Sequence, residues 1–567
     1  MKLRRACRSE SGSLISLHSN NPCMWFQVAR AVVATLILLA TSEVFAVRRE
    51  RTITTWRPLH YSVNITLNDR LSQIVSAETA VEVLVLKKLE TIDFDFGDLT
   101  TDRVAIDDSP VRFSHRNGSL VVSTPKPLNP GTRITVTIAY HGEPKDGLIL
   151  TKDKDGRPSA IGDNWPNRVH QWIPSLDHPS AKATVTFTVT TAPGQLVVAN
   201  GTLDRVETVP NGNRIWTYNE TVAVPPYCMI IAVGDFARLQ PLSSSGYSLS
   251  YYVPRSDDAV AEKGFSSAAP ALQMFSQLVA PYPYEKLALI VGATRFGGME
   301  NSSAIVFTPT LFNRNGNADV SRTFGIPRGT VSLVAHEIAH QWFGDSVTES
   351  TWSDLWLSEG FATYFAGLFL QKHDGEEAFQ NYMQSAAEKY FAYEKKMLTP
   401  VFDPETEDLF KLLNPNNYEK GAWILHMLRS RLGDEKFFRG IRTYFQAHKN
   451  SVASSEDLRA ALEQASATNL RPFFRRWVYD SGHPKYDVTW SWNKKRRGVT
   501  IQLSQVQDGD LFEDPVEILL VGPKSSRTIT ITPRVKQTVQ FVSSNEQPTR
   551  IQIDPRGLLL KEVRIKG

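Results

Sequence analysis

Five consecutive residues, His336-Glu337-Ile338-Ala339-His340, combine two imidazoles and a carboxylate in a pattern that favours metal chemistry. Residues four apart in a helix lie on the same face, one turn from each other, so both histidines can reach a single ion. Glu337 lies beside the first histidine, where its carboxylate can address a water molecule on that ion. The pattern predicts a metal site with a general base next to it.

A catalytic zinc ion keeps three protein ligands and one open position, so the two histidines need a third partner. Glu359 is the candidate, because the eighteen residues between it and the second histidine can finish one helix, turn and begin another. Gly344 suits the end of the first helix, and Ser353 or Asp354 suits the N-cap of the second. The sequence therefore predicts one Zn²⁺ per chain, bound by His336, His340 and Glu359.

The competing interpretation is a pair of surface histidines around a charged residue. The rest of the segment is apolar, with Val331, Val334, Ile338 and Trp342. Polar groups within such a helix need partners, because burying them alone is costly. This favours the metal site. Asp345 and Asp354 could orient a histidine, or each could occupy a helix end.

These residues need elements to position them. Between about residues 50 and 240, hydrophobic residues recur at every second position, as in Ile134, Val136 and Ile138. Such alternation is typical of half-buried strands, and turn-prone clusters such as Asn129-Pro130-Gly131 separate them. We predict a large antiparallel β-domain in this part of the chain.

Helical periodicity takes over between about residues 255 and 480 and includes the metal-site pattern. The predicted helices are Lys263–Leu278, Thr330–Phe343, Ser353–Gln371, Tyr418–Leu432 and Asp434–His448. A short strand is predicted over Leu287–Val291. From about residue 484 to the end, alternation returns, as in Val499, Ile501 and Leu503, and predicts a small β-sandwich.

The chain has 567 residues, a formal net charge of +4, 41% hydrophobic and 22% charged residues. This is an ordinary globular composition, and the length suggests about three domains of roughly 100–200 residues each. The near-neutral charge gives no basic field for nucleic acid, so we expect no nucleic-acid partner.

Residues 1–46 have the pattern of a secretory signal. Arg30 precedes the apolar run Ala31–Ala40, and Val44-Phe45-Ala46 ends in a small residue. The run is shorter than the roughly 20 residues of a transmembrane helix. We predict a cleaved signal peptide, no transmembrane span after cleavage, and an exported protein that is periplasmic, secreted or extracellular. The alternative is an uncleaved anchor, and Met24 is a second candidate start.

Export would permit disulfides, but the chain has only three cysteines, Cys7, Cys23 and Cys228. Cleavage of the signal would leave Cys228 alone. We therefore expect no intramolecular disulfide.

The metal-site motifs resemble those of the M1 family of zinc aminopeptidases, the gluzincins. His336–His340 is followed by Glu359 within Trp356–Ala362, and Gly297-Gly298-Met299-Glu300-Asn301 is similar to the family's GxMEN exopeptidase motif, about 35 residues upstream. Trp172-Ile173-Pro174 is similar to a landmark of the family's N-terminal domain. Phe474–Gly482 resembles the end of its catalytic domain.

The resemblance covers nearly the whole chain after residue 46 and implies a multidomain α+β fold. It implies an N-terminal β-saddle over residues 47–245, a thermolysin-like, mostly helical catalytic domain over 246–482, and a small β-sandwich over 483–567. The helical C-terminal domain that many members carry is not expected in this chain.

The resemblance also implies a reaction and a role for each matched residue. The reaction is hydrolysis of the N-terminal peptide bond of peptides that have a free N-terminus. Glu337 would be the general base and Tyr418 the transition-state tyrosine. Glu300 would bind the substrate's α-amine. The backbone of Gly297, Gly298 and Met299 would align the peptide.

Three positions depart from the family's usual pattern. Gly298 replaces the commoner alanine, as in the leukotriene-hydrolase branch, and Ser358 replaces asparagine before the third ligand. The family often has a Glu or Gln as a second amine anchor nine residues before the proline equivalent to Pro174, where this chain has Trp165. Either a gap shifts the register or the second anchor is absent, and Gln171 is not an obvious substitute.

Two other functions compete with the aminopeptidase. The GGMEN form suggests an epoxide hydrolase, which would need a narrow lipid channel. A catalytically inactive scaffold that binds partners through the same fold would usually lose a ligand or the base, and this sequence keeps every one.

Overall fold

The computed structural model of the protein describes Arg48 and residues 50–52, 54–241, 246–313, 320–324, 326 and 328–566. The predicted signal peptide, residues 1–46, lies outside the described residues. Residues 49–567 form one compact unit, so the domain boundaries drawn from the sequence stay predictions. None of the helices in the described part of the chain has the length and apolar character needed to cross a membrane.

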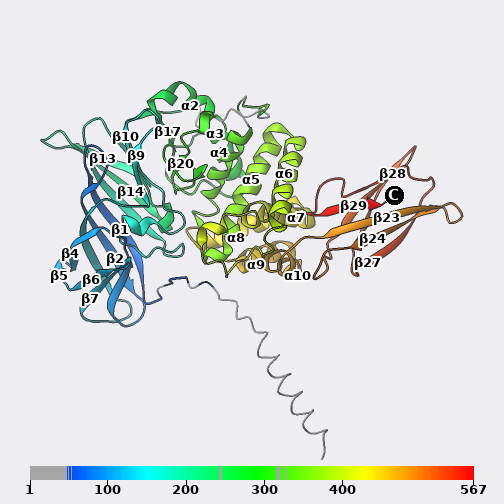
Figure 1. Ribbon diagram of the computed structural model, residues 1–567, viewed down its shortest axis with the longest axis horizontal. Coiled ribbons are helices and arrows are strands. Elements are labelled where there is room, and N and C mark those ends of the chain that lie inside the picture. Colours follow the sequence, from blue (N-terminus) through cyan, green and yellow to red (C-terminus); the bar gives the residue numbers. More distant parts are fainter. Residues whose placement is uncertain are drawn as a thin grey trace, which may run out of the picture. The chain divides into compact units, whose positions relative to one another are not determined.

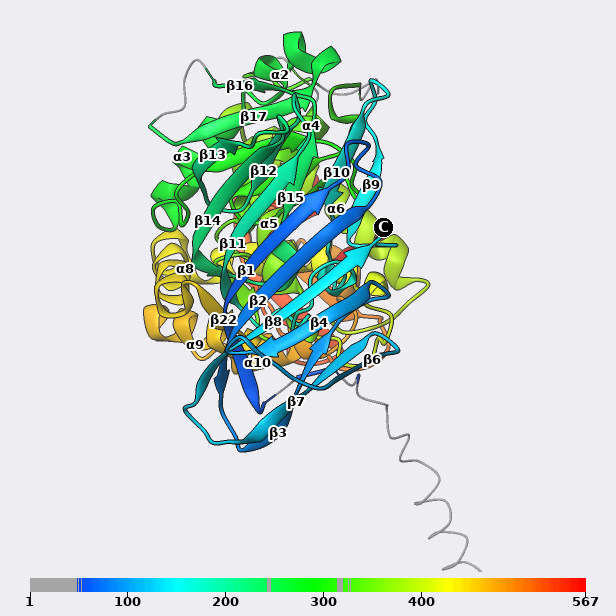
Figure 2. The ribbon, with the colours of Figure 1, turned by 90° about the vertical axis from the view of Figure 1, so that its left-hand side faces the viewer.

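The first part of the chain is built from strands, shown in blue through cyan to blue-green in Figures 1 and 2. Their bounds are β1 Trp56–Leu67, β2 Ile74–Val85, β3 Leu89–Asp95, β4 Thr100–Ile106, β5 Ser109–Pro110, β6 Phe113–Arg116, β7 Ser119–Leu128, β8 Arg133–Gly142, β9 Leu148–Lys152, β10 Pro158–Gly162, β11 Ala183–Thr191, β12 Leu196–Ala199, β13 Thr202–Thr208, β14 Arg214–Val224 and β15 Ile231–Gly234.

The strands form three sheets, of which the largest has the order β13-β14-β11-β1-β2-β8-β4-β5. Figure 2 shows this sheet from its broad side. Alternate residues are buried, as the sequence predicts, so Val185, Phe187 and Val189 of β11 face the core. The prediction of a large antiparallel domain fails at one place: β1 and β11 pair in parallel, with His60 opposite Thr184. Local alternation could not reveal this, because it does not encode strand direction.

The helices follow in the middle of the chain, coloured green to yellow in Figure 1. Their bounds are α2 Asp258–Gly264, α3 Ala268–Leu278, α4 Arg328–His340, α5 Trp356–Asp374, α6 Glu376–Glu394, α7 Gly421–Leu432, α8 Asp434–His448, α9 Ser455–Ser466 and α10 Arg471–Phe474. The prediction of one helix over Lys263–Leu278 is wrong, because α2 ends at Gly264 and α3 begins at Ala268. Helices α6 and α9 and the four-residue α10 are additional to those predicted.

A five-stranded sheet supports the helices, with the order β16-β17-β18-β20-β19. Its strands are β16 Phe236–Leu239, β17 Leu249–Pro254, β18 Leu287–Val291, β19 Gly298–Met299 and β20 Ala304–Phe307. All five residues of β18 are buried, and its bounds match the predicted strand. Strand β19 pairs antiparallel with β20 at the edge of the sheet. This places the Gly297–Glu300 segment beside α4.

Helix α5 is the centre of the helical region. It is buried along most of its length, on all its faces, which is typical of a helix that other elements surround. Phe361 stacks on Phe343, with ring centroids 4.1 Å apart, just after the end of α4. Because α4 and α5 pack closely, groups on the two helices can meet.

The remaining strands are a short pair, β21 Val347–Glu349 and β22 Ser451–Ala453, and those of the C-terminal part. The C-terminal strands are β23 Lys485–Asn493, β24 Gly498–Gln505, β25 Val516–Val521, β26 Ser526–Ile531, β27 Gln537–Ser543, β28 Arg550–Ile553 and β29 Glu562–Lys566. They form a four-stranded and a three-stranded sheet, β27-β24-β23-β29 and β26-β25-β28. The predicted multidomain α+β class is confirmed.

One close approach of backbones fixes the geometry around α5. A π-helical segment, Asn416–Lys420, runs directly into α7. A Cβ atom added to Gly360 of α5 would lie 2.9 Å from backbone atoms of Gly421, and one added to Gly421 would lie 2.9 Å from Cα of Gly360. Only glycines allow this contact, which brings the π-helical segment against α5.

We expect Gly421→Ala to lower the free energy of unfolding by about 1–3 kcal/mol, because the added methyl group overpacks the contact with Gly360. Chemical denaturation followed by circular dichroism measures this. Gly329→Ala is the matched control, because a Cβ atom there meets nothing within 4 Å. It should leave stability unchanged or raise it by up to about 1 kcal/mol. Equal effects of the two substitutions would show that the glycine contact is not tight.

Candidate active site

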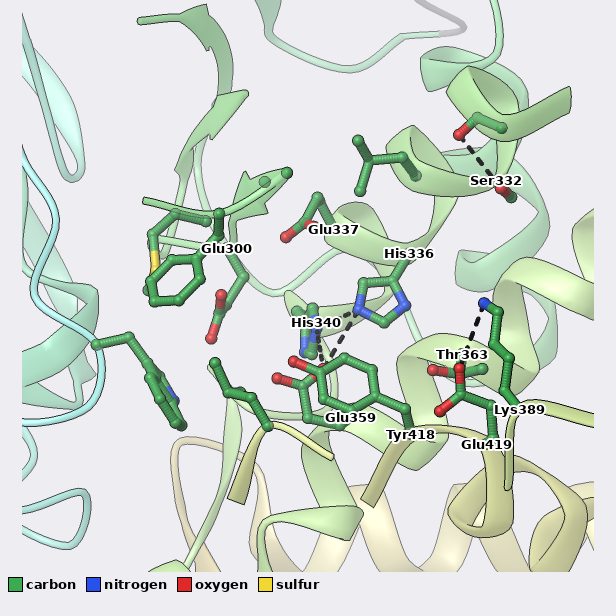
Figure 3. A pocket seen from close by; sticks show the side chains of 18 of the residues that line it. Glu300, Ser332, His336, Glu337, His340, Glu359, Thr363, Lys389, Tyr418 and Glu419 are labelled. Atoms are coloured by element: carbon green, nitrogen blue, oxygen red, sulfur yellow. Dashed lines mark hydrogen bonds and ion pairs between the residues drawn. The ribbon is translucent and has the colours of Figure 1, made fainter. Parts of the chain in front are cut away.

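Three side chains from α4 and α5 converge on one point (Figure 3). Nε2 of His336 lies 3.1 Å from Nε2 of His340. Oε2 of Glu359 lies 3.3 Å from the first of these nitrogens and 3.4 Å from the second. The structure thus brings together the three residues that the sequence proposes as ligands. Two come from adjacent turns of α4, and the third from the first turn of α5.

This triangle fits a tetrahedral zinc ion. Ligand atoms about 2.0–2.1 Å from a shared ion at tetrahedral angles are about 3.3–3.4 Å apart, close to the three distances observed. Oε2 of Glu359 is buried and has no hydrogen-bond partner among the described residues, so it is available to an ion. Glu300, Glu337 and His340 form a second candidate set of metal ligands, with one ligand atom of each within 4.8 Å of the others. The two-histidine set suits zinc better, because zinc favours imidazole nitrogen.

The far side of His340 is held by two oxygens. Its Nδ1 lies 3.1 Å from the carbonyl oxygen of Phe343 and 2.9 Å from Oγ of Ser358. Because a carbonyl only accepts, Nδ1 carries the proton, and Nε2 can present its lone pair to an ion. The sequence flagged Ser358 only as a departure from the usual asparagine, and the structure gives it this orienting contact.

The predicted N-cap of the second helix needs correction. Helix α5 begins at Trp356, and Leu355 precedes it without a side-chain cap, so neither Ser353 nor Asp354 is the N-cap. Asp354 instead accepts hydrogen bonds from the backbone N–H and the hydroxyl of Ser455. The reason is that a 3₁₀ turn, Trp352–Asp354, leads into the helix.

The carboxylate of Asp345 does not orient a ligand histidine but binds Gln341 and Cys228. It accepts hydrogen bonds from Nε2 of Gln341, at 2.8 Å, and from the thiol of Cys228, at 3.2 Å. Gln341 also donates to the carbonyl oxygen of Glu300, at 2.8 Å, and accepts from the N–H of Ser303. Gln341 was not predicted to be part of the site. The sequence feature that could have indicated a role for Gln341 is its position directly after the second histidine, at the end of an apolar helix.

Glu337 and the Gly297–Glu300 segment are in contact. A Cβ atom at residue 298 would lie only 2.3 Å from the carboxyl carbon of Glu337. In this structure, glycine at 298 therefore leaves the space that the Glu337 side chain occupies. Burial raises the pKa of Glu337 well above its usual value, and the neighbouring Glu300 and Glu359 act in the same direction, against His340.

Tyr418 lies in the π-helical segment, and its ring is nearly parallel to that of His336, with centroids 6.0 Å apart and planes at 5°. Burial raises the pKa of its hydroxyl well above the usual value, and Glu359 adds to the effect. The hydroxyl therefore keeps its proton at neutral pH and can donate a hydrogen bond. π-Helical turns are often found at functional sites.

These groups line one cavity of about 440 Å³, a size usual for small-ligand sites. Part of its wall is apolar and includes Trp165, Phe296, Met299 and Leu413. Among the described residues, Trp165 is the one lining residue that comes from the N-terminal strands and their loops. Gln171 instead lies against Gly97 and His170. An ungapped count from Pro174 thus leads to a residue that does line the cavity.

Trp165 is held in place from several sides. Its ring packs edge-on against those of Phe296, 6.0 Å away, and Trp352, 5.6 Å away. Nε of Arg168 donates to its carbonyl oxygen, and the same side chain donates to Asp163. Asp163 also accepts the N–H of Arg295 at 2.7 Å. The loop around Trp165 is thereby joined to the segment that leads to Gly297.

Buried carboxylates dominate the electrostatics of the site. Burial, with a contribution from Glu359, raises the pKa of Glu300 to about 7. Burial also acts against a charge on His340, but the surrounding carboxylates outweigh it and raise its pKa to about 10. The two histidines in turn outweigh the effect of burial on Glu359 and lower its pKa to about 2. The site therefore attracts positive charge, whether as a proton on His340 or as a metal ion.

Two histidines from one helix and a glutamate from the next, with a second glutamate beside the first histidine, form a candidate metal site of the HExxH type. Comparison with known proteins agrees with this class. The Peptidase M1 N-terminal domain matches residues 57–228, and the Peptidase family M1 domain matches residues 265–477. The chain belongs to peptidase family M1.

Individual relatives are aminopeptidases by name. The chain is 26% identical over 457 residues to a probable aminopeptidase 1 of Sulfurisphaera tokodaii, covering 77% of this chain and 55% of the relative. It is 28% identical over 363 residues to a leucyl aminopeptidase of Saccharolobus solfataricus, covering 62% and 44%. It is 27% identical over 376 residues to a glutamyl aminopeptidase of Rattus norvegicus, covering 63% and 39%. The chain spans about half the length of the curated relatives it matches.

We expect Ser358→Ala to weaken zinc binding about tenfold, because His340 loses one of the two oxygens that orient it. Competition with a chromophoric chelator measures the dissociation constant. Ser430→Ala, on an exposed position of α7, is the control and should not change it. An unchanged constant for Ser358→Ala would show that the carbonyl of Phe343 alone orients the imidazole.

Proposed function

We propose that the protein is a zinc-dependent aminopeptidase that hydrolyses the N-terminal peptide bond of peptides with a free N-terminus. One observation carries the proposal: the triangle of His336, His340 and Glu359 opens into the same cavity as Glu337, Glu300 and Tyr418. The family match and the aminopeptidase relatives support it. Export of the protein is a further part of the proposal and rests on residues 1–46 of the sequence alone.

The three ligand atoms would hold the ion. When bound, zinc supplies a water molecule whose pKa is lowered towards about 7 and a positive centre that polarises the scissile carbonyl. Glu337 lies beside the first histidine and takes the proton of the attacking water. It then delivers that proton to the leaving amine.

Two further side chains act on the substrate itself. The carbonyl oxygen gains negative charge as the water attacks, and the protonated hydroxyl of Tyr418 donates a hydrogen bond to it. Glu300 provides a fixed carboxylate for the substrate's ammonium group. Because its backbone is held by Gln341 at the end of α4, this carboxylate keeps its position relative to the ligands. It therefore confines cleavage to the first peptide bond.

The alternative functions differ in their support. An inactive scaffold is disfavoured, because the ligands, base, amine-binding glutamate and tyrosine lie together around one cavity. The epoxide hydrolase stays a prediction from the GGMEN sequence, and no specific observation favours it.

We expect Glu337→Gln to lower kcat for an N-terminal leucine amide substrate by about 10²–10⁴-fold, because the water loses its base. Zinc content, measured by atomic emission, should stay at one per chain, since Glu337 is not a ligand. Glu377→Gln, on the exposed start of α6, is the control.

Removal of zinc from the wild-type protein with a chelator should abolish activity, and added zinc should restore it. Full activity of Glu337→Gln or of the metal-free protein would contradict the proposal.

We expect the wild-type enzyme to leave N-acetylated peptides intact, because acetylation removes the charge that Glu300 binds. Glu300→Gln should lower kcat/KM for free peptides at least about 30-fold, the usual effect of removing one partner of a buried ion pair. Mass spectrometry of both peptide forms measures release of the first residue. Cleavage of acetylated peptides at a comparable rate would exclude amine recognition by Glu300.

A further inference from the structure

The cavity has different charges at its two ends. Figure 3 shows Glu300 on one side of the group formed by His336, His340 and Glu359, and Lys389 with Glu419 on the other side. Ser332 and Thr363 also lie on the side of Lys389 in this view and line the cavity. The end away from Glu300 is thus polar, and the mechanism above does not use it.

Lys389 comes from α6 and Glu419 from the π-helical segment next to Tyr418. Nζ of Lys389 lies 3.4 Å from Oε1 of Glu419. The Lys389 side chain is 65% exposed, and that of Glu419 is 14% exposed. Ion pairs with one such exposed partner are weak, because water screens the charges and the long side chain stays mobile. Lys389 can therefore exchange Glu419 for an anion that enters the cavity.

Among the described residues that line the cavity, Lys389 is the one with an ammonium or guanidinium group. The acidic lining residues are Glu300, Glu337, Glu359 and Glu419. Beyond the metal-binding group, a carboxylate of a ligand would find its one cationic partner at Lys389. An ammonium group would find Glu300 at the opposite end. A zwitterion fits this arrangement of charges.

We infer that the cavity binds short peptides as zwitterions, with the N-terminal ammonium at Glu300 and the free C-terminal carboxylate at Lys389. The inference rests on the proposed function, which fixes the direction of the peptide. The leaving part of the substrate then extends from the metal-binding group towards α6. The cavity of about 440 Å³ is in the size range of small-ligand sites, which fits a short peptide better than a long chain. Glu419 competes with the substrate carboxylate for Lys389.

The test compares Leu-Gly-Gly with Leu-Gly-Gly amide, which lacks the terminal charge. Lys389→Gln should raise KM for the free acid about fivefold, the upper range for an exposed ion pair, and should leave KM for the amide unchanged. Glu419→Gln should lower KM for the acid relative to the amide, because it frees Lys389. Lys436→Gln, at an exposed position of α8, is the control and should change neither.

Binding separates this inference from the proposed function. Calorimetry with zinc-loaded Glu337→Gln protein, alone and combined with Lys389→Gln, gives the ratio of the acid and amide dissociation constants without turnover. If Lys389→Gln changes the ratio of the acid and amide dissociation constants, the inference is supported. If the wild-type protein then cleaves no peptide, the proposed function fails and the inference stands. Equal effects of Lys389→Gln on acid and amide, or no effect on either, would overturn the inference even if the enzyme is an active aminopeptidase.

Discussion

The site depends on the burial of several carboxylates at one place. Glu300, Glu337, Asp345 and Glu359 are all buried, although ionised groups are costly to remove from water. Histidines balance part of the negative charge, and the raised pKa of His340 is a result of this interaction. A divalent cation in the triangle of ligand atoms would balance more of the negative charge. The excess of negative charge destabilises the region when no cation is present, and for the same reason it favours binding of a cation.

Such a cluster needs a rigid frame, and the frame is built from close contacts. Helix α5 is surrounded by other elements and carries Glu359 in its first turn. Gly360, the next residue, touches Gly421, so the segment with Tyr418 sits directly against that turn. On the other side, Gly298 leaves space for Glu337. Small residues at these contacts allow large functional groups to share a small volume.

Much of this arrangement could be predicted from the sequence. The spacing of His336 and His340 is a property of the helix itself, and the strand at residues 287–291 follows from its apolar run. The break between α2 and α3 could not be found, because hydrophobic periodicity continues across it. The parallel pairing of β1 with β11 depends on contacts far apart in the chain.

The surroundings of the ligands were harder to predict than the ligands. Ser358 and Gln341 act through single hydrogen bonds that no periodic pattern records. Lys389 comes from α6, a helix additional to those predicted, and its place at the cavity follows only from packing. Trp165 was located by counting residues, but its neighbours Phe296 and Trp352 come from distant segments.

Trp165 also has a consequence for how the enzyme can diversify. It belongs to a loop of the strand-rich region, whereas the groups proposed for the chemistry belong to the sheet edge, helices and π-helical segment that follow. Substitutions in that loop can reshape a wall of the cavity without moving any ligand.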